Sequence, residues 1–191
     1  MGPVSGRQSS IAAAAVAALI GAAVGATLAE PYQIAASAFL ACCMGAIAYE
    51  DVQRLRVPNT WNALAAIGGF GAVLVEAWRL GSDLLMALGW AALSAIVCGG
   101  VFFLLRELFF LLRGVEGLGF GDVKLAATGG VWLGWEIFPV AVSMAAIGAI
   151  AWIAVAAAIS RSWPRERKIP FAAFLAPAIW ICWLYSRIGQ F

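Results

Sequence analysis

Two aspartates are the residues of this sequence whose surroundings favour catalysis. Asp51 follows an apolar run in the segment Ala48-Tyr-Glu-Asp-Val-Gln-Arg-Leu-Arg-Val-Pro-Asn59, and Asp122 lies in Gly117-Leu-Gly-Phe-Gly-Asp-Val-Lys124. An ionisable side chain beside or within an apolar span is costly, so it requires a partner or a function. Two carboxylates held close together share a proton, so one can act as a general base on water while the other acts as a general acid.

Each aspartate also has a simpler interpretation. Asp51 can be a helix-end carboxylate that pairs with Arg54 or is solvated, and Asp122 can be the N-cap of a helix. The glycines before Asp122 favour more than a cap. Gly119 and Gly121 allow another backbone, such as an extended substrate strand, to approach this carboxylate closely.

Two charged neighbours of the aspartates are expected to have other roles. Lys124 follows Asp122 by two positions, roughly 200° around a helix, so we expect it to extend to the membrane interface rather than to pair with Asp122. Glu50 precedes Asp51, and adjacent helical residues point about 100° apart, so at most one of the two faces a given partner.

Several other chemistries are excluded or disfavoured. The sequence has no histidine, which excludes catalytic triads, Cys-His pairs and HExxH zinc sites. A Ser-Lys dyad would have to use Lys124 or Lys168, and neither lies deep enough in an apolar run to be desolvated easily. The glycines before Asp122 do not follow a strand, so a dinucleotide-binding loop is not indicated. The four cysteines lie in apolar runs without CxxC spacing, so we predict no metal site.

The composition requires that these residues be positioned by membrane helices. Of 191 residues, 64% are hydrophobic and 12% are charged, against roughly 25% charged residues in ordinary soluble domains. The mean hydropathy is +0.94, with nine Trp and 21 Gly, which fits helices that pack through small residues and anchor through interfacial aromatic rings. The net charge of +2 is too close to neutral to indicate a nucleic-acid partner.

Uncharged runs predict the spans. Six runs have 18 or more residues each, close to the roughly 20 needed to cross a hydrocarbon core. A seventh, Leu125 to Trp135, has 11 residues and spans only if its helix begins near Asp122 and ends near Glu136. The GxxxG pairs Gly21/Gly25 and Gly130/Gly134 are candidate close helix contacts. The six long runs are residues 8–29, 31–49, 57–75, 84–105, 137–160 and 169–186.

The distribution of Lys and Arg predicts the orientation. With seven spans, ten of these residues fall on one side of the membrane, and only Arg79 and Arg187 fall on the other. The positive-inside rule then places the N-terminus and both aspartates at the cytoplasmic side. The first run is long for a signal peptide. We therefore predict an all-α polytopic membrane protein with about seven transmembrane helices, six long and one short helix that starts at the Gly-Phe-Gly-Asp motif.

Three motifs resemble those of a known family, the type IV prepilin peptidases, which are membrane aspartic proteases with a GxGD motif. The segment Gly119-Phe-Gly-Asp122-Val-Lys-Leu125, followed by Trp132-Leu-Gly-Trp135, resembles the GxGDxKL segment and its helix. Asp51 followed by Val57-Pro58-Asn59 resembles the first aspartate motif, and Lys168-Ile-Pro170-Phe171 resembles the late IPF segment. The motifs occur in the family's order.

The resemblance implies an endopeptidase of the bacterial inner membrane. It would remove a short basic leader from a prepilin or pseudopilin at the cytoplasmic face, with Asp51 and Asp122 as the catalytic pair and with neither metal nor cofactor. Membrane lipid and the prepilin are the implied partners, and nucleic acid is not one. The residues implied to bind substrate or support the loops are Gly119, Gly121, Lys124, Pro58, Asn59, Pro170 and Phe171.

The sequence also departs from many bacterial members. It lacks the insertion with paired CxxC motifs that is associated with N-methylation, so it resembles the short form found with tight-adherence (Flp) pili, and methyltransferase activity is not implied. The family usually has an apolar residue where Glu50 stands. We divide the chain into residues 1–32, a cytoplasmic tail with the first helix, and residues 33–191, a peptidase-like membrane domain.

One alternative comes from another functional class. In a small proton-coupled transporter or channel, intramembrane aspartates relay protons and broken helices line a cavity. Inverted repeats and carboxylates near the middle of the membrane would favour this reading, whereas the predicted carboxylates lie at a boundary. A pilus-assembly scaffold without catalysis is a third reading.

Overall fold

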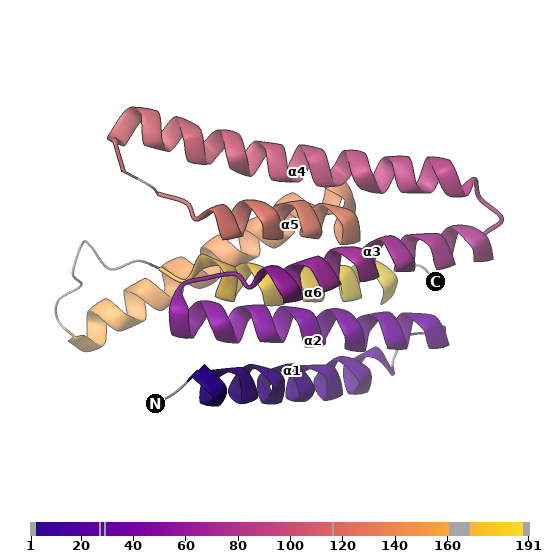
Figure 1. Cartoon of the computed structure of the whole chain (residues 1–191), viewed down its shortest axis with the longest axis horizontal. Coiled ribbons are helices and arrows are strands. Elements are labelled where there is room, and N and C mark those ends of the chain that lie inside the picture. Colours follow the sequence, from indigo (N-terminus) through magenta and orange to yellow (C-terminus); the bar gives the residue numbers. More distant parts are fainter. Residues whose placement is uncertain (1–2, 27, 29, 116, 161–168, 189–191) are drawn as a thin grey trace.

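The computed structural model describes residues 3–26, 28, 30–115, 117–160 and 169–188, and every element within these ranges is an α-helix. The helices run roughly along the long axis of the molecule (Figure 1). The basic segment 161–168, which includes Lys168 of the third motif, lies outside the described residues. In chain order the helices are α1 (Pro3–Gly25), α2 (Pro31–Arg54), α3 (Asn59–Arg79), α4 (Leu84–Arg113), α5 (Phe120–Ser160) and α6 (Phe171–Ile188).

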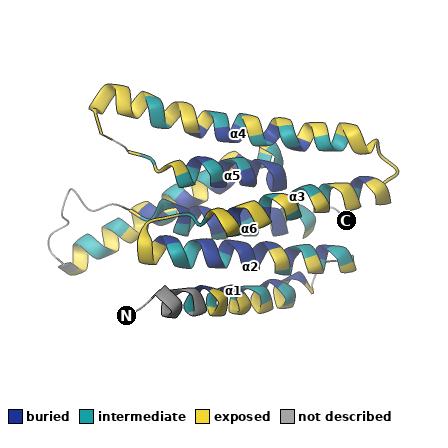
Figure 2. Cartoon of the chain, viewed as in Figure 1, coloured by how far each residue is buried: buried dark blue, intermediate teal, exposed yellow. Residues whose placement is uncertain are grey.

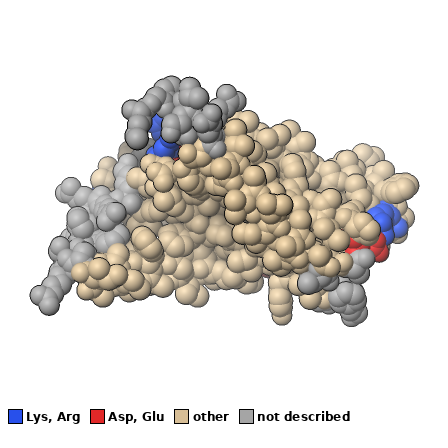
Figure 3. Space-filling view, turned by 90° about the horizontal axis from the view of Figure 1, so that it is seen from below, with Lys and Arg blue, Asp and Glu red and all other residues tan. Residues whose placement is uncertain are grey.

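The helices have the lengths and surfaces of membrane spans. Five of them, α2 to α6, are long and apolar enough to cross a membrane, and the described apolar part of α1 is shorter, Ser9–Gly25. On the face in Figure 3, the visible charged side chains lie only near the two ends of the molecule. Large apolar side chains face outward, as in Leu104 and Ile147, which are 67% and 68% exposed. The chain is an all-helical polytopic membrane protein.

The core lies between α2, α6 and the first part of α5, where buried residues concentrate in Figure 2. On α2 the buried residues recur at helical spacing, so that a single face turns inward. This packing brings the end of α2 and the starts of α5 and α6 to one end of the bundle. The largest fully buried apolar side chains are Leu40, Met44 and Ile47 of α2, Leu125 of α5, and Leu175 and Ile179 of α6.

α5 consists of two helices joined by a turn at Gly134, where the backbone has φ 69° and ψ 166°. Residues 120–133 form the first helix, which starts at Phe120 within the Gly-Phe-Gly-Asp motif, and residues 135–160 form the second. In Figure 1 the second helix runs back toward the end of the bundle at which the first began. The predicted short helix is thus a separate element, and it begins two residues before Asp122.

Contacts with α4 follow this change of direction. From Phe120 through the turn, α5 contacts progressively earlier positions of α4, and beyond the turn the contacts return toward the C-terminal end of α4. The contacts, in chain order, are Phe120 with Arg106, Gly130 with the backbone of Ser94, Trp135 with Trp90 at a ring-centre distance of 5.7 Å, and Phe138 with Phe102 at 5.8 Å.

In one of the two predicted glycine pairs, both glycines contact a neighbouring helix. A Cβ added at Gly21 would lie 2.9 Å from the carbonyl oxygen of Ser37 in α2, and Gly25 also lies against Ser37. The Ser37 hydroxyl donates to the carbonyl of Gly21 at 2.9 Å. In the other pair, Gly130 contacts α4 closely, but Gly134 forms the turn and meets no atom within 4 Å.

Ion pairs join helices at the end of the bundle opposite the aspartates. Arg79 at the end of α3 donates to Glu30 just before α2 at 2.5 Å. Arg187 near the end of α6 pairs with Glu76 of α3. These contacts tie α3 to both α2 and α6.

We expect Gly134→Ala to destabilise the protein. A residue with a Cβ is strained at φ 69° and ψ 166°, a region that is essentially limited to glycine and costs about 1–3 kcal/mol otherwise. Thermal unfolding of the detergent-solubilised protein, followed by circular dichroism, measures the effect. Gly100→Ala is the control, because Gly100 is helical and has nothing within 4 Å of an added Cβ. Equal melting temperatures of the two variants would contradict the strained turn.

Candidate active site

Asp51 and Asp122 line one pocket of about 300 Å³ at the end of the bundle where α2 ends and α3 and α5 begin. They are 71 positions apart in the sequence, yet both line this one pocket. The structure thus brings together the two residues predicted as a pair. The other lining residues are Leu55, Arg56, Val57, Asn59, Gly119, Phe120, Gly121 and Lys124.

Asp51 is held by the start of α6. Its side chain lies in the last turn of α2 and is only 5% exposed. Its Oδ2 accepts a hydrogen bond from the backbone N–H of Ala173 at 2.9 Å. α6 begins at Phe171, so this amide is one of the donors that lack a partner within their own helix. The positive end of the α6 dipole also favours a carboxylate at this position.

This contact gives a structural role to two predicted residues. Pro170 and Phe171 lie directly at the start of α6, and the Pro170 carbonyl accepts from the Ala173 N–H at 3.2 Å. They therefore position the amide that reaches Asp51. The predicted site did not include Ala173, because its backbone rather than its side chain makes the contact. The Ile-Pro-Phe sequence, which marks a helix start, was the available signal.

Arg54 does not pair with Asp51, contrary to the simpler interpretation of that carboxylate. Its Nε lies 3.6 Å from Oε2 of Glu50, one helical turn earlier. Because adjacent residues diverge by about 100°, Glu50 meets Arg54 while Asp51 turns inward to α6. The structure therefore separates the two neighbouring acids into an ion pair and a pocket residue.

Asp122 is the third residue of α5 and not its N-cap, which corrects the sequence interpretation. Gly119 precedes the helix, its N–H donates to Asp122 Oδ2 at 3.2 Å, and its carbonyl accepts from the Asp122 N–H at 3.0 Å. This is the half of a capping box in which the third helical side chain reaches back to the residue before the helix. Asp122 is half-buried, and its carboxyl group is held by its own turn.

Gly121 permits a close approach, but of this chain's own backbone. A Cβ added at Gly121 would lie 2.9 Å from two side-chain carbons of Val57 and 3.4 Å from its backbone nitrogen. At Gly119 an added Cβ would lie 3.2 Å from Oδ2 of Asp122. The glycines let the connection after α2 and the Asp122 carboxyl group pack against the start of α5. These contacts lie within this chain, and the approach of a substrate strand to the two glycines stays a prediction.

Lys124 and Asn59 join α5 to α3 beside the pocket. The Lys124 Nζ donates to Asn59 Oδ1 at 3.0 Å and lies 5.0 Å from the ring centre of Phe120. Pro58 is the N-cap residue of α3, and its carbonyl accepts from the Asn62 N–H at 3.1 Å. The Val-Pro-Asn motif thus starts α3 at the level of the aspartates.

Two buried polar residues near the pocket were missed by the sequence reasoning. The Thr128 hydroxyl donates to Asn62 Oδ1 at 3.1 Å, and Asn62 Nδ2 donates to the carbonyl of Lys124 at 3.4 Å. Asn62 lies one turn after Asn59, and Thr128 lies one turn after Lys124. This shared helical spacing was the available signal.

No group of three or more His, Cys, Asp or Glu side chains that could hold a metal ion occurs among the described residues. The cysteines form no disulfide, and Cys43, Cys98 and Cys182 are buried.

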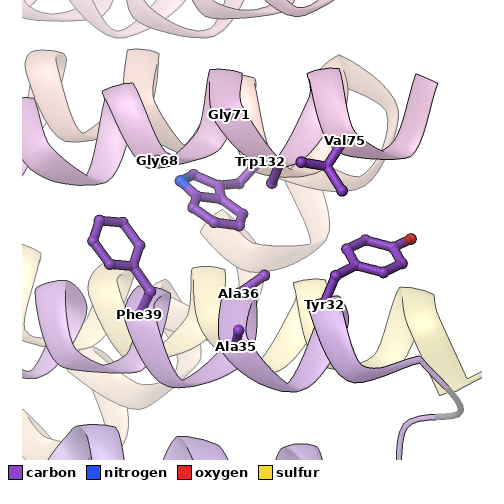
Figure 4. A pocket seen from close by; sticks show the side chains of 9 residues that line it. Tyr32, Ala35, Ala36, Phe39, Gly68, Gly71, Val75 and Trp132 are labelled. Atoms are coloured by element: carbon purple, nitrogen blue, oxygen red, sulfur yellow. The ribbon is translucent and has the colours of Figure 1, made fainter. Parts of the chain in front are cut away.

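A second pocket, of about 310 Å³, lies between α2 and α3 with Trp132 at its back (Figure 4). Its lining residues include no carboxylate, whereas two carboxylates that could act as acid and base line the pocket with Asp51 and Asp122.

The chain matches the model of the type IV leader peptidase family over residues 38–156. This range includes both aspartates and the Gly-Phe-Gly-Asp motif, and it ends before the Ile-Pro-Phe segment.

Curated relatives have the same printed name, prepilin leader peptidase/N-methyltransferase. The protein of Aeromonas hydrophila is 30% identical over 169 residues, which cover 88% of this chain and 56% of the relative. That of Aeromonas salmonicida (strain A449) is 29% identical over 170 residues, with 88% and 55% covered. The Burkholderia pseudomallei (strain 1026b) protein is 44% identical over 92 residues, which cover 46% and 29%. This chain spans just over half of the Aeromonas proteins. No solved structure matches it significantly.

We expect Gly121→Ala to lower the melting temperature of the protein, and we expect the addition of Val57→Ala to reverse part of this loss. The added methyl group meets Val57 carbons at 2.9 Å, so a smaller residue at position 57 restores the space. Melting temperatures of the two single variants and the double variant in detergent form a double-mutant cycle. Additive effects of the two substitutions would contradict the direct contact.

Proposed function

Since the chain belongs to the type IV leader peptidase family, we propose that it is an aspartic endopeptidase that cleaves the leader peptide from type IV prepilins. The observation that carries this proposal is the shared pocket of Asp51 and Asp122, which come from distant parts of the sequence. Two neighbouring carboxyl groups share a proton, so one activates a water molecule and the other donates to the carbonyl oxygen of the scissile bond. This reaction needs neither a covalent intermediate nor a cofactor.

The position of the pair suits an extended peptide. Both residues lie at helix ends beside non-helical connections, at the end of the bundle rather than halfway along it. Water and a peptide strand can reach such a place, whereas a helix buried in hydrocarbon keeps its backbone hydrogen-bonded internally. We propose that the substrate is a prepilin or pseudopilin with a short basic leader before its hydrophobic helix. Residues 33–191 form the catalytic unit, and residues 1–32 add a helix.

The type of pilus is proposed from what the sequence lacks. The relatives are named for a peptidase and an N-methyltransferase, but the four cysteines of this chain form no CxxC pair. We therefore propose the peptidase reaction alone, of the short form that serves tight-adherence (Flp) prepilins. A proton-coupled transporter is less favoured, because both carboxylates lie at one end of the bundle and no described carboxylate occupies its middle.

The orientation follows from the same reasoning. We propose seven crossings of the bacterial inner membrane, with the two parts of α5 as separate spans. The N-terminus and the catalytic pocket then face the cytoplasm, where the excess of Lys and Arg lies.

Asp51→Asn and Asp122→Asn should each reduce prepilin cleavage by about 100-fold or more, because the shared proton is lost. Purified variants are incubated with candidate Flp prepilins, and the new N-terminus is mapped by mass spectrometry. Glu50→Gln is the matched control, because Glu50 adjoins Asp51 but pairs with Arg54, and we expect it to retain substantial activity. Appreciable cleavage by either Asn variant would refute the catalytic pair.

Cysteine labelling tests the orientation. In a variant without the native cysteines, Ser82→Cys lies between α3 and α4, and Val115→Cys lies between α4 and α5; both positions are exposed. An impermeant maleimide should label Cys at position 82 in spheroplasts, and should label position 115 only after the membrane is permeabilised. The reverse pattern would overturn the proposed topology.

A further inference from the structure

Polar contacts join α3 to the first helix of α5 at every turn, and we name this set the α3–α5 ladder. Its members lie three positions apart on α3 and four apart on α5, so the two helices run in parallel with one contact per turn. The contacts are Lys124 Nζ to Asn59 Oδ1 at 3.0 Å, Asn62 Nδ2 to Lys124 O at 3.4 Å, Thr128 Oγ1 to Asn62 Oδ1 at 3.1 Å, and Trp132 Nε1 to Ala65 O at 2.8 Å.

The centre of the ladder is buried. Asn62 is 8% exposed and Thr128 is 2% exposed. A buried polar group without a partner costs about 1–3 kcal/mol, so such residues stay in an apolar core only where they are bonded. Here both ends of the Asn62 amide are used, one toward Thr128 and the other toward the carbonyl of Lys124.

The arrangement at Thr128 is specific. A threonine within a helix commonly bonds the carbonyl four residues earlier, which at Thr128 is the carbonyl of Lys124. In this structure Asn62 takes that carbonyl, and the Thr128 hydroxyl donates across to Asn62. The Asn62 side chain of α3 is thereby bonded to two positions of α5: the Lys124 carbonyl, two residues after Asp122, and the Thr128 hydroxyl one turn later.

Asp122 needs such external support. Its own hydrogen bonds go to Gly119 in the same turn, so they fix its conformation but not its place relative to Asp51. The first helix of α5 covers only residues 120–133, and helices of this length depend on tertiary packing for stability. The rotation and height of this helix are therefore set by its neighbours: α4 packs closely against it at Gly130, and the ladder adds directional hydrogen bonds from α3.

We propose that Asn62 and Thr128 are positioning residues, which hold the start of α5 so that the Asp122 carboxyl group stays next to that of Asp51. The catalytic meaning of this geometry rests on the proposed function, whereas the geometry itself can be measured separately. A misplacement of about 1 Å can cost an enzyme roughly 100-fold in rate, so a small shift of this helix is enough to matter.

Thr128→Val tests the proposal, because it removes the hydroxyl and keeps the volume. We expect kcat for prepilin cleavage to fall by about 10- to 100-fold with an unchanged KM, and Thr128→Ser, which restores the donor, to recover activity. Ser94→Ala is the matched control: it also removes a buried hydroxyl, but one that bonds the Trp90 carbonyl within α4. It should leave kcat unchanged.

A second measurement reports the geometry without catalysis. In the full-length chain lacking its native cysteines, Asp51→Cys and Asp122→Cys are bridged with a short bis-maleimide. We expect the yield of intramolecular bridging to fall when Thr128→Val is added, and to persist with Thr128→Ser. If Thr128→Val does not accumulate as a folded protein, Asn62→Ala is measured instead, since it breaks the same contact from α3.

The outcomes separate the two proposals. A kcat and a bridging yield in Thr128→Val that match the parent would overturn the positioning role, and so would a fall in kcat without any change in bridging. If the parent protein cleaves no prepilin, the proposed function fails, while the bridging series still decides whether the ladder positions Asp122.

Discussion

A carboxyl group buried in an apolar bundle is tolerated only where donors reach it, and Asp51 meets this requirement at the start of α6. The Ala173 amide that it accepts from lies 122 positions later in the chain, at 2.9 Å. This bond requires α6 to begin at the level of the last turn of α2. The last turn of α2 therefore lies beside the first turn of α6, and the buried faces of both helices build the core. A requirement at the site thus also determines the register of the central helices.

Asp122 is supported in a different way. Its carboxyl group depends on the Gly119 amide of its own turn, and its helix is held from α3 by Asn62 and Thr128. The hydrogen bonds that reach the two sides of the pocket therefore come from separate helices, from α6 to Asp51 and from α3 to the helix that carries Asp122. Each carboxyl group thus has its own hydrogen-bond donor, from Ala173 for Asp51 and from Gly119 for Asp122, while both residues line one pocket.

The helices were predicted well from the sequence because the thickness of the hydrocarbon core sets a minimum length for the uncharged run of each span. It also predicted that Asp51 and Asp122 would lie at the same end of the bundle, where both line one pocket, because ionisable groups in an apolar chain are conspicuous. It did not predict their local contacts. Asp122 is the third residue of α5 rather than its cap, and the residue close to Gly121 is Val57. Asn62 and Thr128 are neutral residues on apolar helices; their spacing from Asn59 and Lys124 places each pair on one helix face, but only tertiary packing shows that the two faces meet.

Because α3 bonds the helix that carries Asp122 and α6 bonds Asp51, the way these two helices are held together contributes to the separation of the carboxyl groups. Trp132 links them: its indole N–H donates to the Ala65 carbonyl of α3 at 2.8 Å, and its ring packs edge-on against Trp183 of α6 at 5.7 Å. The Glu76–Arg187 ion pair joins the same helices at the far end. Trp132 lies ten residues from Asp122, or about 15 Å along a helix. Its packing therefore reaches the pocket through rigid helices and not through direct contact.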